Sequence, residues 1–444
     1  MKKLVLTLLI ASTIVLTGCF KDDDTPIVIE EITIINEGGG NTPTGAPIIV
    51  KAGGIALDET WTSDNIYELD RRVVVQDGVT LTIEAGTIIK GRAGTGSLAS
   101  ALIVARGGKI NAVGTAAAPI IFTSTSDNID VGETAGTNLN QDNRGLWGGL
   151  IVLGYAPCSL KGDLEEAQIE GIPADDTFGL YGGTDAADDS GRIEYVSIRH
   201  GGALIGEGNE INGLTLGGVG SGTTLNNIEV VANVDDGIEF FGGTVDASNL
   251  LVWAQGDDAI DIDQAYSGTI DNAVVVLGAA SDHAFEIDGP EGSTPMGSEG
   301  SFTLTNATII GNSETSNGEY ADYRSKARGT TTNVFAKGFP AGKDVELDNN
   351  GVSQNFLDGL ITFADWQVVG FNNSIFVEKV GCAQNCDDTD ESNDIDEDKI
   401  ILSPDFTERA AAWTTQVTDG AQTVGANTAN LSWTYANAAG GLGF

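Results

Sequence analysis

Residues 226–230 and 234–239 read Asn-Asn-Ile-Glu-Val and Val-Asp-Asp-Gly-Ile-Glu, and the chain writes nearly the same phrase twice more. The second copy occupies residues 248–261, and the third occupies residues 271–286. A period in the low twenties, with short β-branched runs and glycine-rich corners, is typical of a β-solenoid whose coils stack on one another. The repeat therefore predicts an all-β fold, a parallel β-helix.

Stacking converts repeated positions in the sequence into columns in space. One such column consists of asparagines, at positions 227, 249, 272 and 306. Stacked amide side chains can bond to one another from coil to coil. We therefore expect this column to be an internal amide ladder with a structural role.

The acidic residues of the repeat form three further columns. They are Asp235, Asp257 and Asp282; Asp236, Asp258 and His283; and Glu239, Asp261 and Glu286. Neighbouring strands lie about 4.8 Å apart, where two carboxylates repel by roughly 3 kcal/mol at an effective dielectric constant near 20. Solvation, a raised pKa or a bound cation must relieve this repulsion.

Three interpretations of the acidic columns stay open. Asp at the corners of a coil can simply be solvated or bond to the local backbone. Several Asp on adjacent coils also suit Ca²⁺, which prefers hard oxygen ligands. The candidate Ca²⁺ ligands are Asp235, Asp236, Asp257, Asp258, Asp261 and Glu239. The third interpretation is catalysis, and no organic cofactor is expected under any of them.

Two phrases outside the repeat carry a family resemblance. Residues 78–87 read Gly-Val-Thr-Leu-Thr-Ile-Glu-Ala-Gly-Thr and residues 198–202 read Ile-Arg-His-Gly-Gly. The chain resembles, over most of residues 60–340, the right-handed parallel β-helix family best known from pectin-degrading enzymes. It also looks like a group of bacterial surface lipoproteins that share these phrases. The resemblance implies an architecture and leaves the activity open, because one fold hosts many functions.

A second resemblance concerns the order of polar motifs. The series Asn233-Val234-Asp235, Gly256-Asp257-Asp258, Asp282-His283-Ala284 and Arg324-Ser325-Lys326 is similar to that of polygalacturonase-type glycoside hydrolases. That resemblance implies that Asp235, Asp257, Asp258 and His283 carry the reaction. Arg324 and Lys326 would hold the carboxylate of the sugar.

Three of these four motifs depart from the family's pattern, at Val234, at Asp282 with Ala284, and at Ser325. A lyase would instead need Ca²⁺ and a basic residue, and Arg199 is a candidate only if it lies on the acidic face.

The N-terminus has the pattern of an exported lipoprotein. Met1-Lys2-Lys3 precedes an apolar stretch that ends in Leu16-Thr17-Gly18-Cys19. This stretch resembles a lipobox, which implies cleavage before Cys19 and acylation of that cysteine as a lasting membrane anchor. Phe20-Lys21-Asp22-Asp23-Asp24 looks like the signal that sends some lipoproteins to the cell surface. We expect the protein in the outer membrane, exposed at the surface.

The composition restricts the partners. A net charge of −42 repels nucleic acid, so no nucleic-acid role is expected. Cys382 and Cys386 are close enough in sequence to form a disulfide in an oxidising envelope. The predicted function is to bind or scaffold an extracellular glycan or envelope protein, with a uronate-type polysaccharide hydrolase or lyase as the alternative.

The chain divides into four expected regions. These are a signal peptide (1–18), a lipidated tether (19–46), the β-helix (47–345) and a C-terminal cap (346–444). Short helices are expected at 353–362 and 407–417, because the twenties period is lost there. Residues 158–190 interrupt the coils and are expected to form a rim over one face.

Overall fold

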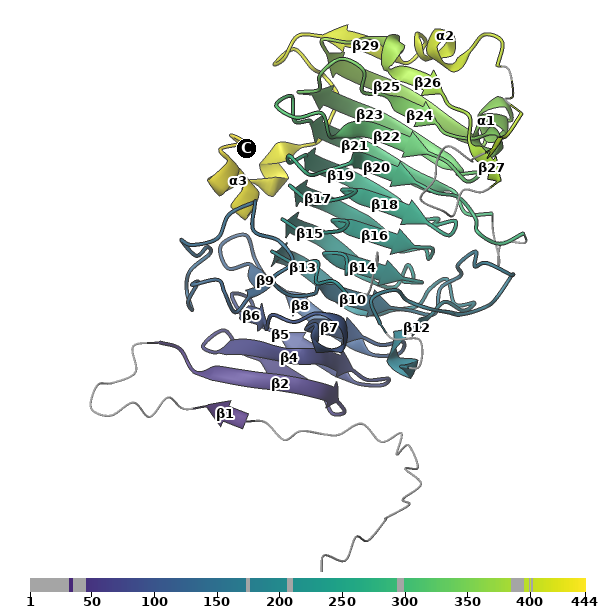
Figure 1. The fold of residues 1–444 in the computed structure, drawn as a ribbon. Helices are drawn as coiled ribbons and strands as arrows, with labels where there is room; N and C mark the ends of the chain where they lie inside the picture. The colour runs from purple at the N-terminus through teal and green to yellow at the C-terminus, as the bar shows by residue number, and fades with distance from the viewer. Residues whose placement is uncertain are drawn as a thin grey trace, which may run out of the picture.

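The computed structural model describes residues 32–34, 45–172, 176–205, 211–293, 299–384, 395–398, 400 and 402–444. Its strands stack in parallel into one elongated right-handed β-helix, from β2 at one end to β26 and β29 at the other (Figure 1). The predicted fold class is confirmed. No helix within the described ranges is long and apolar enough to cross a membrane.

Each regular coil consists of one short strand and one long, bent strand. The short strands pair with one another and form sheet 1: β7 (Ala101–Val104), β10 (Leu150–Leu153), β14 (Leu214–Gly217), β16 (Ile238–Phe241), β18 (Ile260–Asp263), β20 (His283–Ile287), β22 (Glu319–Tyr323), β24 (Val345–Leu347) and β26 (Phe376–Glu378). The long strands form the other two sides: β13 (Gly191–Arg199), β15 (Thr224–Val231), β17 (Ala247–Trp253), β19 (Thr269–Val276), β21 (Phe302–Ile310), β23 (Gly329–Lys337) and β25 (Ile361–Val369).

The first coils, before β13, are less regular. Their remaining strands are β2 (Ile48–Ile55), β3 (Glu59–Trp61), β4 (Ile66–Val75), β5 (Thr80–Ile83), β6 (Ile88–Gly91), β8 (Lys109–Val113) and β9 (Ile120–Ser124). A short strand, β1 (Ile32–Ile34), pairs antiparallel with Ile48–Val50 at the start of β2. The solenoid therefore begins at β2.

The predicted asparagine column lies at the bend of the long strands. Asn227, Asn249, Asn272, Asn306 and Asn333 all have φ between 56° and 65°, a left-handed conformation that Asn tolerates better than most residues. The amide of Asn249 donates to Asn226 at 2.7 Å, and that of Asn272 donates to Asn249 at 2.7 Å. The amide ladder is thus confirmed in part, because Asn272 bonds to Asn249 within the column whereas Asn306 donates to Asp271. The left-handed bend explains why the repeat keeps Asn where each strand turns.

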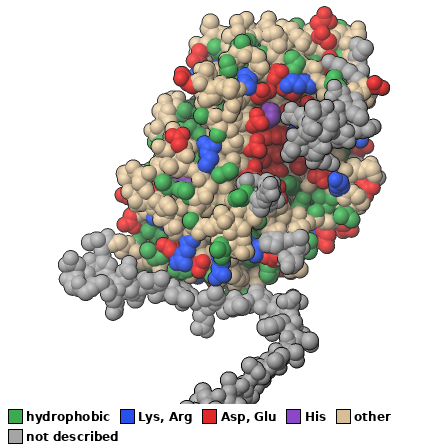
Figure 2. All heavy atoms as spheres, viewed as in Figure 1, with side chains coloured by type: hydrophobic (Ala, Val, Ile, Leu, Met, Phe, Trp, Pro, Cys, Tyr) green, Lys and Arg blue, Asp and Glu red, His purple; other side chains and the backbone are tan. Residues whose placement is uncertain are grey.

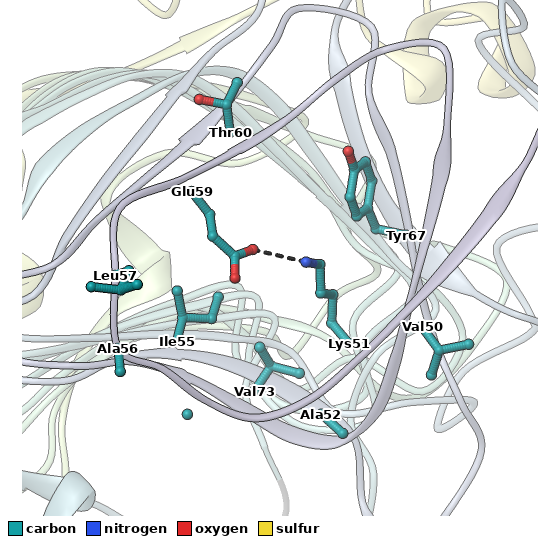
Figure 3. A pocket seen from close by; sticks show the side chains of 11 residues that line it. Val50, Lys51, Ala52, Ile55, Ala56, Leu57, Glu59, Thr60, Tyr67 and Val73 are labelled. Atoms are coloured by element: carbon teal, nitrogen blue, oxygen red, sulfur yellow. Dashed lines mark hydrogen bonds and ion pairs between the residues drawn. The ribbon is translucent and has the colours of Figure 1, made fainter. Parts of the chain in front are cut away.

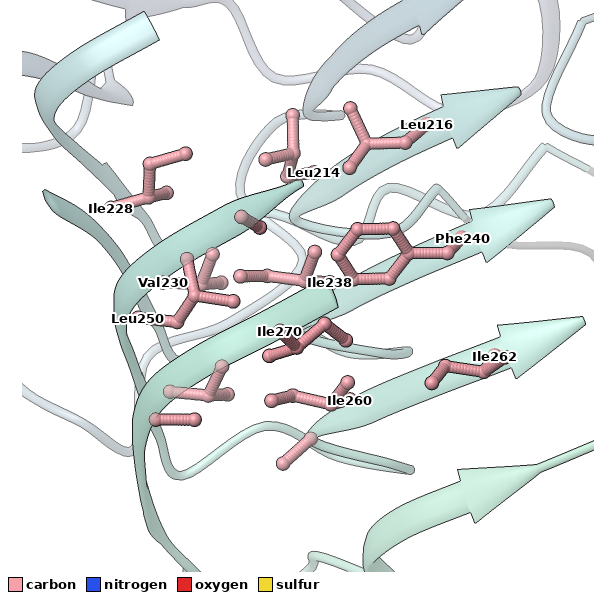
Figure 4. Close-up of a cluster of buried hydrophobic side chains, with 14 of the residues drawn as sticks. Leu214, Leu216, Ile228, Val230, Ile238, Phe240, Leu250, Ile260, Ile262 and Ile270 are labelled. Atoms are coloured by element: carbon pink, nitrogen blue, oxygen red, sulfur yellow. The ribbon is translucent and has the colours of Figure 1, made fainter. Parts of the chain in front are cut away.

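The core fills the interior of the coils. Alternate side chains of each short strand point inward, as Ile238 and Phe240 do in β16 (Figure 4). They meet inward side chains of the long strands, among them Val230. The side chain between them, Glu239 in this strand, points outward, because successive residues of a strand face opposite sides.

The expected boundary at residue 345 is wrong, because parallel pairing continues well beyond it. β24 pairs with β26, β25 pairs with β23, and β25 pairs in turn with β29 (Thr414–Val417). The helices expected here are shorter than predicted, at Asn350–Leu357 (α1) and Phe406–Ala410 (α2). After α1, the alternating apolar residues Ile361 and Phe363 favour a strand over a longer helix.

The C-terminal residues turn back along the outside of the solenoid. Leu431 and Ala436, the latter in α3 (Tyr435–Gly440), pack on Val231, Leu251 and Val274 of the long strands. Other segments outside the solenoid are β11 (Ala167–Gln168) with β12 (Leu180–Tyr181), and β27 (Cys382–Gln384) with β28 (Ile395–Asp396).

Candidate functional site

Carboxylates on the outer face of sheet 1 form a continuous column, which we call the acidic ladder. Its members come from β16, β18, β20, β22 and β24 and pair in register: Glu239, Asp261, Glu286, Asp322 and Glu346. The register confirms the column expected from Glu239, Asp261 and Glu286. It extends that column by two coils, and Figure 2 shows the acidic strip on the molecular surface.

A second column of ionisable residues runs beside the ladder, two positions further along each chain segment. Its members are Asp263, Asp288, Arg324, Asp348 and Lys379. The backbone N–H of each of the last four donates to a carbonyl of the preceding coil, for example Asp288 to Ile262 at 2.7 Å. The parallel register therefore continues through this column and sets its spacing.

A third column lies at the corner before the strands and includes Asp236, Asp258 and His283. Asp236 accepts a hydrogen bond from the backbone N–H of Asp258 at 3.0 Å. Asp258 accepts one from the backbone N–H of His283 at 2.7 Å and contacts the His283 Nδ1 atom at 2.9 Å. These carboxylates thus hold the corner of the next coil, which is the role that the structural interpretation expects.

Burial and mutual repulsion raise the pKa values of the acids in these columns. Burial is the larger cause at Asp322, where the pKa rises to about 8, with the charge of Asp348 adding to it. The same causes raise the pKa of Asp263 to about 8, and burial raises that of Glu346 to about 8. The pKa values of Glu239 and Asp261 also lie well above their usual range, because both carboxyls are buried beside other acids. Asp263, Asp322 and Glu346 therefore hold protons at neutral pH unless a cation replaces them.

Basic side chains neutralise one half of the ladder. Arg324 forms ion pairs with Glu286, with Asp288 and with Asp322, and Lys379 pairs with Glu346. The described residues show no such ion pair for Glu239, Asp261 or Asp263. The half that begins at β16 therefore has no basic partner among the described residues.

Two ladder carboxyls and one from a neighbouring column could share a cation at each of two places. Oxygen atoms of Asp236, Glu239 and Asp261 lie within 4.8 Å of one another, as do oxygen atoms of Asp322, Glu346 and Asp348. A third group of this kind is Asp235, Asp236 and Asp257. Oxygen-only donor sets of this size suit Ca²⁺.

One oxygen in each of the first two groups has an unfilled bonding capacity. Asp322 is 5% exposed, and its Oδ1 atom has no hydrogen-bond partner among the described residues. The Oδ1 atom of Asp261 is likewise buried and unpartnered there. A buried carboxylate oxygen without a hydrogen-bond partner lowers the stability of the folded protein. The carboxyls of both groups therefore fit the role of ligands to a divalent cation.

The predicted catalytic residues are only partly brought together. Asp235, Asp257, Asp258 and His283 lie at the corner of sheet 1, and Arg324 lies beside the ladder. Lys326 is exposed after β22, and its carbonyl accepts from Asn355 of α1 at 2.6 Å. A contact of its side chain with a sugar carboxylate stays a prediction.

Arg199 is also on a different side of the solenoid. Its guanidinium is buried beside Ser197 and Glu229 on β13 and β15, and it lies over the ring of Tyr435 at 4.4 Å. Arg199 thus fastens the C-terminal segment and does not face the acids, so the condition on which it was a candidate base is not met.

The geometry of the corner acids disfavours hydrolysis by inversion. Oxygen atoms of Asp235 and Asp257 lie within 4.8 Å, whereas inverting glycosidases hold their two carboxyls about 6.5–9.5 Å apart. The contact with Asp258 raises the pKa of His283 to about 9 in spite of its burial, so His283 is a cation at neutral pH. A cationic His283 cannot accept a proton there.

The insertion after β10 closes one end of the acidic face. The ladder position is occupied by Ile103 in β7, Ile151 in β10 and Thr215 in β14 before it reaches Glu239. Leu160 and other insertion residues pack over these isoleucines. The rim expected from residues 158–190 is therefore present over sheet 1, and the ladder starts where this apolar cover ends.

The sequence analysis did not predict several acids of the ladder and of the column beside it, namely Asp263, Asp288, Asp322, Glu346 and Asp348. A signal for them exists, because the short strands read Ile-Asp-Ile-Asp at 260–263, Phe-Glu-Ile-Asp at 285–288 and Val-Glu-Leu-Asp at 345–348. Apolar and acidic residues alternate in each. Insertions between the coils changed the period and hid this repetition.

Two predicted site residues lie outside the described residues. Cys19, the predicted lipidation site, is one, and Cys386, the expected partner of Cys382, is the other. Both remain predictions.

The fold and the ladder define a parallel β-helix protein with an acidic outer face. The family model of the pectate-lyase-like β-helix domain matches residues 53–418, which is most of the chain, so the protein belongs to that family. No curated protein and no solved structure matched the chain. Membership supports a role with polysaccharides or as a scaffold.

Proposed function

We propose that this protein is a surface-exposed, lipid-anchored member of the family whose acidic ladder binds divalent cations, Ca²⁺ first. The observation that carries the proposal is the pair of buried oxygen atoms, Oδ1 of Asp261 and Oδ1 of Asp322, that lack a partner among the described residues. Each lies in a group of three carboxyls close enough to share one ion. A bound cation would supply the positive charge that the β16 half of the ladder lacks.

The proposed partner is an acidic extracellular glycan, of the uronate type, or an envelope protein. Sheet 1 is too acidic to attract such a glycan by itself, since like charges repel. A Ca²⁺ ion held by Asp236, Glu239 and Asp261 would reverse this locally and could share its remaining coordination positions with a carboxylate of the glycan. Binding to the glycan should therefore require Ca²⁺.

Calorimetric titration with Ca²⁺ tests the cation site. The wild-type protein should take up Ca²⁺, the double variant Asp261→Asn with Asp322→Asn should lose this uptake, and Asp142→Asn should retain it. Asp142 is a suitable control because it is exposed and belongs to none of the carboxyl groups that could share an ion. No uptake by the wild-type protein at millimolar Ca²⁺ would reject the site.

Retention on immobilised polygalacturonate, with and without chelator, tests the glycan. We expect retention only in Ca²⁺, and loss of it in the same double variant. Uptake of Ca²⁺ without retention would leave the cation site in place and favour an envelope protein as the partner.

A polysaccharide hydrolase or lyase is the second candidate. It is supported by Asp257, which lies at the edge of the acidic face and has a pKa raised to about 6 by partial desolvation of its carboxyl group and by the charge of Asp258. A carboxyl of that pKa suits a general acid. The enzyme should release reducing ends or unsaturated products from a uronate-rich polysaccharide, and Asp257→Asn should abolish this; absence of products from all such substrates rejects the candidate.

The anchor is tested separately. Mass spectrometry of the mature protein should find acyl chains on Cys19, and Cys19→Ala should release the protein from the membrane. Protease added to intact cells should cleave it if it is displayed at the surface.

A further inference from the structure

Charge is distributed very unevenly along the solenoid. Residues 47–113, which form the first coils, contain seven Lys and Arg and seven Asp and Glu, so they are neutral. Residues 114–444 contain 12 basic and 51 acidic residues, a net charge of −39. The end at which the chain enters the solenoid therefore lacks the excess negative charge that residues 114–444 carry when taken together.

The same end exposes apolar surface. A cavity of about 480 Å³ opens there, lined by core side chains such as Ile55, Tyr67 and Val73 (Figure 3). The ion pair of Lys51 with Glu59, at 2.9 Å, spans the cavity. Leu57, which also lines it, is 79% exposed, more than any other large apolar side chain of the described residues.

A second cavity, of about 510 Å³, lies beside β2 as well. It is lined by Leu98, which is 59% exposed, and by Arg71 and Arg72. Both cavities share Ala52 and Gly54. β1 covers only Ile48–Val50, so the rest of the β2 edge has no partner strand among the described residues.

The length of the tether restricts where this end can be. Ile32, the first residue of β1, lies thirteen positions after Cys19. A fully extended chain of that length spans at most about 45 Å. An acylated Cys19 would therefore keep the β2 end close to the bilayer.

We infer that the β2 end of the solenoid is a membrane-docking surface, on which Leu57 and Leu98 contact the headgroup region of the bilayer. The inference rests on the proposed lipid anchor. The neutral first coils are not repelled by anionic headgroups, whereas residues 114–444, with a net charge of −39, are repelled. Repulsion of the far coils and contact at the near end together hold the long axis away from the membrane, so that the acidic ladder faces outward.

Site-specific quenching of the anchored protein tests the surface. A fluorophore is attached at Leu57→Cys in the full, lipidated chain, with Cys382 and Cys386 replaced by Ser; Cys158 is buried and does not react. The matched control carries the label at Leu357→Cys, which is 41% exposed in α1 near the opposite end. Both are reconstituted into phosphatidylethanolamine–phosphatidylglycerol vesicles that contain a headgroup-labelled quencher lipid.

Quenching should be at least about two-fold stronger at position 57 than at position 357, since only the near end reaches the headgroups. Equal quenching at both positions, in vesicles that carry the protein by flotation, overturns the docking surface and leaves the anchor intact. Failure of the protein to float shows that the anchor itself is wrong, and the docking surface falls with it. Concentration-dependent self-quenching of the Leu57 label between copies would show that a second chain covers the cavity, which also overturns the proposal.

Discussion

At the scale of single residues, the carboxyls of the ladder are the side chains that the fold does not need. Inward residues such as Ile260 and Ile262 fill the core. The fold would accept any polar side chain at the outward positions of sheet 1. Instead, Asp261 and Asp322 place unpartnered, buried oxygen atoms beside other acids. Such an arrangement lowers the stability of the protein without a cation, which is why we assign it a function.

Stability should fall as the pH rises when no divalent cation is present. The pKa values of Asp263, Asp322 and Glu346 are about 8 in the folded protein and about 4 in an unfolded chain. Between these values the folded state binds more protons than the unfolded state, so the free energy of unfolding decreases with pH. The melting temperature in chelator should therefore drop from pH 5 to pH 8, and Ca²⁺ should reduce that drop.

Asp322→Asn should remove part of this pH dependence. At pH 8 in chelator the variant should be more stable than the wild type by at least about 1 kcal/mol, because each unit of raised pKa corresponds to about 1.4 kcal/mol. Thermal unfolding across pH measures this, with Asp142→Asn as the control that follows the wild type. A variant whose pH slope equals that of the wild type contradicts the assignment.

The two histidines should titrate on opposite sides of their ordinary pKa. Contact with Asp258 raises the pKa of His283 to about 9, whereas burial lowers that of His200. Proton NMR of the imidazole resonances resolves both, since the chain has only these two histidines. Asp258→Asn should bring the pKa of His283 down by more than one unit and leave His200 unchanged; a His283 that already titrates below 6.5 rules out the charged contact.

At the scale of elements, the bend of each long strand is set by an asparagine. Its left-handed φ is unfavourable for most residues by about 1–2 kcal/mol, and its amide bonds to the neighbouring coils. Asn249 donates to Asn226 and accepts from Asn272, both at 2.7 Å. Conformation and hydrogen bonding are therefore separable contributions at one position.

Substitution of Asn249 should separate them. Asn249→Ala loses both contributions and should lower the free energy of unfolding by about 2–3 kcal/mol. Asn249→Gly recovers the left-handed conformation and should lower it by about 1 kcal/mol less than Ala does. Denaturant unfolding measures the difference, and equal effects of Ala and Gly would show that the bend contributes nothing.

The strands of the repeat were predictable because their period is visible in one dimension. The Asn column and the column of Glu239, Asp261 and Glu286 follow from the spacing of the repeat alone. Pairing beyond residue 345 was not predictable, since the insertions there carry α1 and α2 between strands. The backbone conformation at Lys326 was also inaccessible from sequence, because Ser325 and Lys326 are both left-handed, with φ of 49° and 63°.

At the scale of the whole molecule, the solenoid separates three tasks along its axis. The first coils are neutral and, we propose, rest on the membrane. The insertion after β10 covers the next part of sheet 1 with apolar residues. Beyond it the acidic ladder runs from β16 to β24, where Arg324 and Lys379 neutralise the last coils. Composition alone indicated an acidic body, but only the stacking shows that its acids gather on one sheet.

The central claim is that the ladder holds a divalent cation, and an anomalous difference map tests it most directly. Crystals of the protein soaked in a calcium-site lanthanide such as Tb³⁺ should show peaks against Asp236, Glu239 and Asp261, and against Asp322, Glu346 and Asp348. Both peaks should disappear in the double variant Asp261→Asn with Asp322→Asn. A map with no peak along sheet 1, or with peaks unchanged in that variant, would contradict the account.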